Sequence, residues 1–231
     1  MNASVTVNTP HIIGWGHTPF GKLDNTDLEQ LIRDAALPAV ASAGLELKDI
    51  DGIFVGHFNG GFVRQDFSGA MVAVAIPEFR HVPSVRLENA CATGSAAIWA
   101  AIDALQSGRV KRALVIGLEK MNTLPSAQIG EVLLRCSYVK MEGETPSGFA
   151  GVFGNIASSY FERFGDQSDA LASIAAKNHV NGMNNPYAHM KRDFGFDFCR
   201  QPSEKNHFVA GPLKRSDCSL VSDGAAAMVL S

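Results

Sequence analysis

The chain has 231 residues, of which 46% are hydrophobic and 19% are charged. This is the composition of an ordinary globular protein that can bury a sizeable core. The net charge of −3 gives no reason to expect nucleic acid or an anionic membrane as a partner. No apolar run is long enough to cross a bilayer, and the polar segment 1–10 lacks the regions of a signal peptide. We therefore expect a cytoplasmic protein with reduced thiols.

The first half of the chain alternates short apolar strands with helices. Strands are expected at 11–16, 50–55, 83–88 and 112–117, and helices at 26–43, 67–76 and 92–105. Thr26 and Glu29 have capping-box spacing at the start of the first helix, and Pro38 should kink or split that helix. Strand and helix in alternation predict an α/β layered fold.

The character of the sequence changes at Met121. Helices are expected at 148–164 and 169–181, the latter with Ser168 as a possible cap, followed by an irregular stretch and a final strand at 225–230. We interpret residues 121–211 as an insertion over the sheet, and 1–120 with 212–231 as the core. Because the chain stops inside an apolar strand, it looks incomplete.

The stretch 85–105 reads as a strand, a sharp bend and a helix, with Cys91 at the bend. The helix is apolar almost all round, so we expect it to be buried on every side. A thiol at the first turn feels the partial positive charge and the unpaired N–H groups of the helix N-terminus, which favour a nucleophilic thiolate. The alternative is that Cys91 is a small buried residue, as most free cysteines are.

Other polar residues around this bend have simpler interpretations. The backbone N–H of Cys91 is the local candidate for an oxyanion donor. Asn89 is expected to order the turn, and Glu119, Asp223 and His179 are interpreted as structural. The seven histidines include no pair at metal-ligand spacing, so no metal site is predicted. The remaining cysteines are interpreted as structural thiols, namely Cys136, Cys199 and Cys218.

Several motifs together resemble a known family. The sequence Asn-Ala-Cys-Ala-Thr-Gly-Ser at 89–95, followed by Gly-Leu-Glu-Lys-Met at 117–121, resembles the thiolase superfamily, and most closely the sterol-carrier-protein type. Three further stretches agree with that subgroup, at 176–188, at 212–219 and at 222–227. The resemblance covers essentially the whole chain.

This resemblance implies the amino-terminal half of a thiolase, with a mixed five-stranded sheet between helices and an inserted loop domain. It implies that Cys91 is the acylated nucleophile and that the substrates are acyl-coenzyme A thioesters, with no further cofactor. The activity would be that of an acetyl-CoA acetyltransferase, by thiolytic cleavage or Claisen condensation. Dimers would form through the strand at 84–88. Five basic residues in or next to the insertion are candidates to meet the coenzyme A phosphates, the alternative being ordinary exposed surface charges: Lys191, Arg192, Lys205, Lys214 and Arg215.

The chain also departs from the family pattern. A complete thiolase has a second half with a Gly-His-Pro histidine, a further cysteine and an oxyanion-hole group, and none of these motifs is found here. The His-Met-Gly turn of classical thiolases is matched by Val152-Phe153-Gly154, which is compatible with the subgroup. Three functions therefore stay open, of which the first two are an acyltransferase completed by a second half or a partner chain and a non-catalytic half-thiolase subunit or scaffold. A third is a hydrolase or carbon–carbon lyase acting on acyl-coenzyme A.

Overall fold

The computed structural model describes residues 9–231, which form two compact units. The first unit holds residues 9–123 together with Ser222–Ser231, and the second is Leu124–Val221. The second unit therefore extends ten residues beyond the boundary expected at 211, because a small hairpin at 208–214 packs within it.

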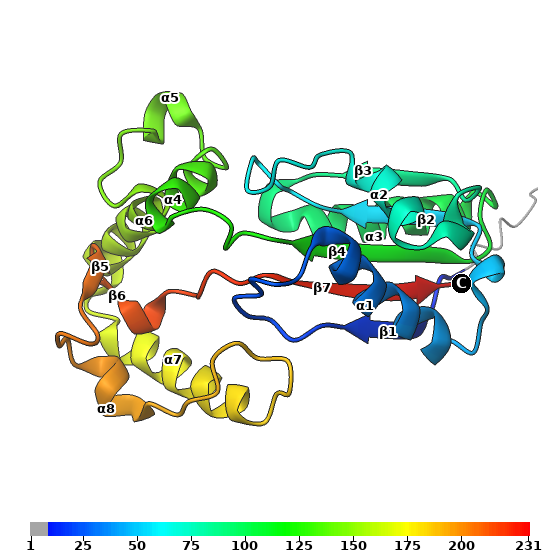
Figure 1. Cartoon of the computed structure of the whole chain (residues 1–231). Coiled ribbons are helices and arrows are strands. Elements are labelled where there is room, and N and C mark those ends of the chain that lie inside the picture. The colour runs from blue at the N-terminus through cyan, green and yellow to red at the C-terminus, as the bar shows by residue number, and fades with distance from the viewer. Residues whose placement is uncertain (1–8) are drawn as a thin grey trace, which may run out of the picture. The chain divides into compact units, whose positions relative to one another are not determined.

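A mixed five-stranded sheet forms the first unit, in the order β1-β7-β4-β2-β3 (Figure 1). The strands are β1 Ile12–His17, β2 Gly52–Gly56, β3 Ser84–Leu87, β4 Ala113–Glu119 and β7 Gly224–Leu230. β2 pairs in parallel with β3 and β4, whereas β7 is antiparallel to β1 and β4. The predicted mixed five-stranded α/β sheet is confirmed.

Helices cover both faces of this sheet. α1 (Leu28–Ser42) and α2 (Ser68–Ala75) share one core with the β2 side chains Ile53 and Val55. α3 (Thr93–Gln106) shares the opposite core with Phe54 and its β4 neighbour Val115. Because successive side chains of a strand point to opposite faces, β2 and β4 are apolar throughout.

The first helix differs from its prediction in two details. Its N-cap is Asp27 rather than Thr26, and the Asp27 carboxylate accepts a hydrogen bond from the Gln30 N–H at 2.7 Å. α1 also runs continuously through Pro38, without the expected split. A wholly buried face that includes Ala35 and Ala39 packs the helix on both sides of the proline, which outweighs the one lost backbone bond.

The second unit is mainly helical. Its helices are α4 Ser126–Leu134, α5 Val139–Glu142, α6 Gly148–Phe164, α7 Ser168–Met183 and α8 Gly195–Arg200. β5 (Phe208–Ala210) and β6 (Leu213–Lys214) form a separate two-stranded sheet. α6 and β5 approach so closely that a side chain on Gly154 would meet Ala210 at 2.8 Å. Within residues 9–231, no helix combines the length and the apolar character that a membrane span requires.

Candidate active site

Cys91 lies in a tight turn between β3 and α3. A single turn of 3-10 helix, Ala90–Ala92, joins them, and the thiol is exposed to solvent. The preceding residue, Ala90, has φ +46°, in the left-handed region that residues with a Cβ rarely enter. This strain turns the chain sharply enough to place Cys91 at the first turn of the helical segment rather than in the strand.

Side chains on both sides of Cys91 hold this turn. Glu88 Oε1 accepts the Ala90 N–H at 2.5 Å. Thr93 Oγ1 accepts the Asn89 N–H at 2.8 Å and donates to the Ala90 carbonyl at 2.6 Å. The bonds that order the turn therefore come from Glu88 and Thr93, not from the Asn89 side chain that sequence reasoning singled out. The sequence signal that could have indicated this is Thr93, two residues after the cysteine, because threonine hydroxyls often bond to nearby backbone groups.

The prediction that the helix after Cys91 is buried on every side is wrong for the single chain. Ala97, Ala101 and Ala104 are buried against the sheet, whereas Trp99 is 66% exposed on the other side. Ser95 is also exposed. The sheet contacts only one side of α3, and within residues 9–231 the other side exposes Trp99 next to the polar residues Asp103 and Gln106.

The head of α3 sits directly on the end of β2. A side chain on Gly56 would lie 3.1 Å from the Thr93 carbonyl oxygen and 3.3 Å from the Thr93 methyl. Both contacts are tighter than ordinary van der Waals packing, so a larger residue would require the head of α3 to move back by a few tenths of an ångström. Gly56 therefore lets β2 support the turn that carries Cys91.

Glu119, at the end of β4, bridges to the loop after β2. Its carboxylate accepts the backbone N–H groups of Phe58 and Asn59 at 3.1 and 3.2 Å. The wholly buried His57 lies beside it, with Nε2 3.4 Å from Glu119 Oε1. Arg86 of β3 donates to the His57 and Phe58 carbonyls. These contacts give Glu119 a structural role, in line with its interpretation from the sequence.

Asp223 occupies the buried point where β4 ends and β7 begins. Its carboxylate accepts bonds from the backbone N–H groups of Leu23, Met121 and Asn122 and forms an ion pair with Lys120 at 3.1 Å. Burial by itself would raise the pKa of Asp223, but these hydrogen bonds outweigh it and hold the pKa below its usual value. Asp223 thus ties together three segments of the first unit.

Residues 11–194 match the family described as "Thiolase, N-terminal domain". This match spans more than half of the chain. The chain belongs to the thiolase family. Its strand–turn–helix geometry around Cys91 lies within the matched range.

The curated relatives that this chain matches are longer proteins. The chain is 30% identical over 220 residues to the acetyl-CoA acetyltransferase of Methanothermobacter thermautotrophicus, covering 95% of this chain and 56% of the relative. It is 33% identical to the acetyl-CoA acetyltransferase of Methanocaldococcus jannaschii, covering 95% and 54%. The benzoylsuccinyl-CoA thiolase subunit BbsB of Thauera aromatica is 30% identical, with 95% and 54% covered. The chain thus spans about half the length of these relatives.

Solved thiolase-like structures share the fold. The structure titled "Ltp2-ChsH2(DUF35) aldolase" superposes with a TM-score of 0.71 and 22% identity, covering 96% of this chain and 55% of that chain. An acetyl-CoA acetyltransferase from Syntrophomonas wolfei superposes with a TM-score of 0.69 and 19% identity, covering 97% and 65%. At these identities the likeness establishes the fold alone.

The other residues singled out from the sequence of this thiolase domain lie in its second unit. His179 packs edge-on against Phe194 with ring centroids 4.7 Å apart, as expected for a structural histidine. Lys214 is buried and paired with Asp217 at 3.0 Å, so its assignment as a candidate phosphate contact is wrong. The other four basic candidates are exposed: Lys191, Arg192, Lys205 and Arg215.

The remaining cysteines of the thiolase domain differ from Cys91. Cys199 is wholly buried beside Ala172 and Ala175, and burial raises the pKa of its thiol. Burial also raises the pKa of the half-buried Cys218. A raised pKa keeps a thiol protonated and unreactive, so neither competes with Cys91 as a nucleophile. Residues 9–231 contain no group of three or more His, Cys, Asp or Glu side chains arranged to hold a metal ion.

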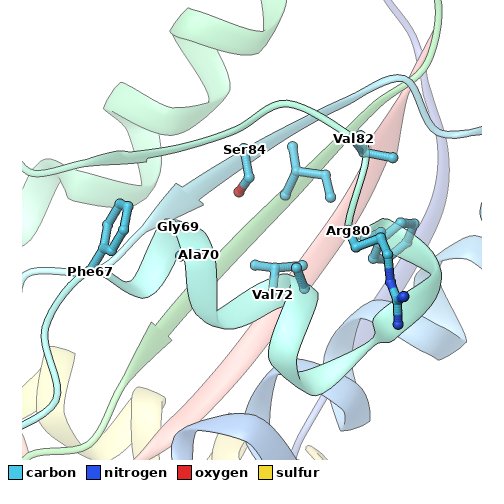
Figure 2. A pocket seen from close by; sticks show the side chains of 10 residues that line it. Phe67, Gly69, Ala70, Val72, Arg80, Val82 and Ser84 are labelled. Carbon is cyan, nitrogen blue, oxygen red and sulfur yellow. The ribbon is translucent and has the colours of Figure 1, made fainter.

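A pocket of about 230 Å³ lies between α2 and the edge strand β3, as Figure 2 shows. Its lining includes Val72 of α2 and Ser84 of β3, with Arg80 among the surrounding side chains. Val72 belongs to the core shared with α1 and α2, on the face of the sheet opposite α3. Cys91 is not among the lining residues, so this pocket is not assigned to the candidate active site.

Proposed function

We propose that this chain is the nucleophile-bearing part of a thiolase-type acyltransferase that acts on acyl-coenzyme A. The observation that carries the proposal is Cys91, an exposed thiol in a turn held by Glu88 and Thr93 at the head of α3. The names of the curated relatives, acetyl-CoA acetyltransferase and thiolase, support the same reaction class.

The first step would form an acyl-enzyme. The Cys91 thiolate attacks the thioester carbonyl carbon, a carbon–sulfur bond forms, and the negative charge moves to the carbonyl oxygen. The backbone N–H of Cys91 is the local donor for that oxyanion. Collapse breaks the bond to coenzyme A, whose thiolate leaves and is protonated.

The second step would transfer the acyl group from Cys91. In thiolysis the acceptor is the thiolate of coenzyme A, and in condensation it is the carbanion of a second acyl thioester. Both acceptors need an acid/base group, which the family resemblance places in a second half. We therefore expect full turnover only when such a half is present, on the same chain or on a partner.

Acylation is tested by intact mass. The complete protein or complex is incubated with acetyl-CoA, quenched in acid and weighed, and the modified peptide is sequenced. We expect one added acetyl group on Cys91 and none in a Cys91→Ala variant. Absence of an adduct at Cys91 in the complete protein contradicts the proposal.

A second candidate is a non-catalytic subunit that stabilises a partner in an acyl-coenzyme A complex. The exposed Trp99 of α3 favours it, as does the name of one relative, a benzoylsuccinyl-CoA thiolase subunit. Pull-down with light scattering distinguishes this subunit role from the acyltransferase role. A stable complex with a partner, without any adduct on Cys91, supports the subunit role. Product analysis would distinguish acyl transfer from carbon–carbon cleavage or hydrolysis.

A further inference from the structure

Three consecutive peptide units around Cys91 are fixed by hydrogen bonds. The Glu88–Asn89 unit donates its N–H to Thr93 Oγ1 at 2.8 Å. The Asn89–Ala90 unit donates to Glu88 Oε1 and accepts from the Ala92 N–H at 2.9 Å. The Ala90–Cys91 unit accepts two bonds from Thr93, one from its backbone N–H and one from its hydroxyl at 2.6 Å. Thr93 takes part in the first and the third of these contacts.

The third contact bears on the chemistry. A peptide unit is planar and trans, so its C=O and N–H point in opposite directions. The Thr93 hydroxyl holds the Ala90 carbonyl on the side of the α3 head, and the Cys91 N–H in the same unit must therefore point away from Thr93. Rotation of this unit would turn the Cys91 N–H out of the direction that the bonds to the Ala90 carbonyl fix.

We propose that Thr93 is a positioning residue for Cys91, which fixes the Ala90–Cys91 peptide so that its N–H faces the reacting sulfur and the oxyanion. This inference rests on the proposed role of Cys91 as the nucleophile. Thr93 acts through the backbone and does not itself touch the substrate.

Burial makes Thr93 better suited to this role than Glu88. Thr93 is only 6% exposed, and its methyl group packs against Gly56 at the end of β2. Water has little access to compete for its hydroxyl, whereas the Glu88 carboxylate is exposed. The methyl group fixes the side-chain rotamer, and the hydroxyl then has both partners within reach.

The test separates the hydroxyl from the methyl group. Thr93→Val keeps the shape and removes the hydroxyl, while Thr93→Ser keeps the hydroxyl and removes the methyl. Ser107→Ala is the matched control, because the Ser107 hydroxyl donates to the Ala104 carbonyl three residues back in the same way, at the far end of α3. Folding of each variant is checked by circular dichroism.

The measurement is the rate at which iodoacetamide alkylates Cys91 in the full chain, followed by peptide mass spectrometry, with Cys218 as the reference in each sample. We expect Thr93→Val to slow alkylation at pH 7 about tenfold, because peptide dipoles no longer stabilise the thiolate. At about pH 10 the variant should match the wild type, since ordinary thiols are ionised there. In Thr93→Ser and Ser107→Ala, the rate of Cys91 alkylation should stay within about twofold of the wild-type rate.

The outcomes separate the two proposals. If wild-type Cys91 reacts no faster than Cys218 at pH 7, the nucleophile proposal fails whatever Thr93 does. If Cys91 is reactive and folded Thr93→Val reacts as fast, or Ser107→Ala slows it equally, the role of Thr93 is overturned. Should Thr93→Val not fold, Thr93→Ser decides: a wild-type rate supports the hydroxyl, and a tenfold loss overturns its role.

Discussion

At the scale of single residues, buried polar side chains hold the first unit together where its strands end. Asp223 shows this most clearly, because one carboxylate serves Leu23, Lys120, Met121 and Asn122 at the junction of β4 and β7. Its side chain is wholly buried, so the removal of its charge leaves Lys120 without a counterion in a site that water barely reaches.

We therefore predict that Asp223→Asn lowers the free energy of unfolding at pH 7 by about 2–4 kcal/mol. The pKa of Asp223 is lower in the folded than in the unfolded protein, so its contribution is complete above the unfolded value and is lost as the pH falls through the folded value. The difference between wild type and variant should therefore shrink below about pH 4. Urea unfolding of the wild type and the variant, from pH 7 to below about pH 4, measures this difference in the free energy of unfolding.

Asp24→Asn is the matched control for that series. Asp24 is paired with Lys22 at 3.7 Å, but both side chains are 63% exposed. An exposed pair of this kind contributes little, so the variant should stay within about 0.5 kcal/mol of the wild type at every pH. Equal losses in the two variants would show that burial of Asp223 has no energetic weight.

At the scale of elements, close backbone approach sets the packing of helices on the sheet. Gly16 of β1 faces α1 so closely that an added Cβ would lie 2.2 Å from the Ala35 carbonyl oxygen and 2.8 Å from the Ala39 amide nitrogen. Both are backbone atoms of a packed helix, so neither can move without shifting α1 itself.

We predict that Gly16→Ala lowers the free energy of unfolding by at least about 1–3 kcal/mol, because α1 must retreat from the sheet. Gly117→Ala is the comparison within the same sheet, since its added Cβ would meet only the Ala226 carbonyl oxygen at 3.9 Å. That variant should be neutral or slightly stabilising. The denaturant midpoints of the two variants measure their losses in the free energy of unfolding. Similar losses in Gly16→Ala and Gly117→Ala would contradict the steric argument.

These elements also show what the sequence could predict. The strands β2 and β4 could be predicted from their apolar runs, because strands covered on both faces are apolar throughout. The helix α6 could be predicted from its helical periodicity, because an amphipathic helix leaves that pattern. α8 lies in a stretch expected to be irregular, because six residues are too few for a periodic signal. The apolar composition of α3 indicated that its surface requires cover, but not whether this chain or another supplies it. The contacts of Thr93 depend on the left-handed turn at Ala90, which periodicity does not reveal.

At the scale of the whole molecule, two surfaces of the first unit lack partners within the described chain. One is the outer face of α3, with Trp99. The other is the free edge of β3, the last strand in the sheet order, where Val85 is 47% exposed. An open edge that carries an apolar side chain favours pairing with another strand.

The dimer expected from the family resemblance would use this edge. Val85 is in register with Phe54, whose side chain belongs to the core under α3, so Val85 lies on the α3 side of the sheet. A charge there should oppose strand pairing without disturbing the buried core. We predict a wild-type dimer, and predict that Val85→Lys shifts it to monomer by at least tenfold in dissociation constant, as about 1.4 kcal/mol of lost association would.

Light scattering coupled to size exclusion, over a range of protein concentrations, measures the mass of each variant. Leu37→Lys is the control, because Leu37 is an exposed apolar residue of α1, which packs against β1 and β7 at the other side of the sheet. It should leave the mass unchanged, since its lysine lies away from the β3 edge. A wild-type chain that remains monomeric, or a Val85→Lys variant that dimerises as the wild type does, would remove β3 as the interface. The exposed Trp99 of α3 would then be the next candidate for a contact with another chain.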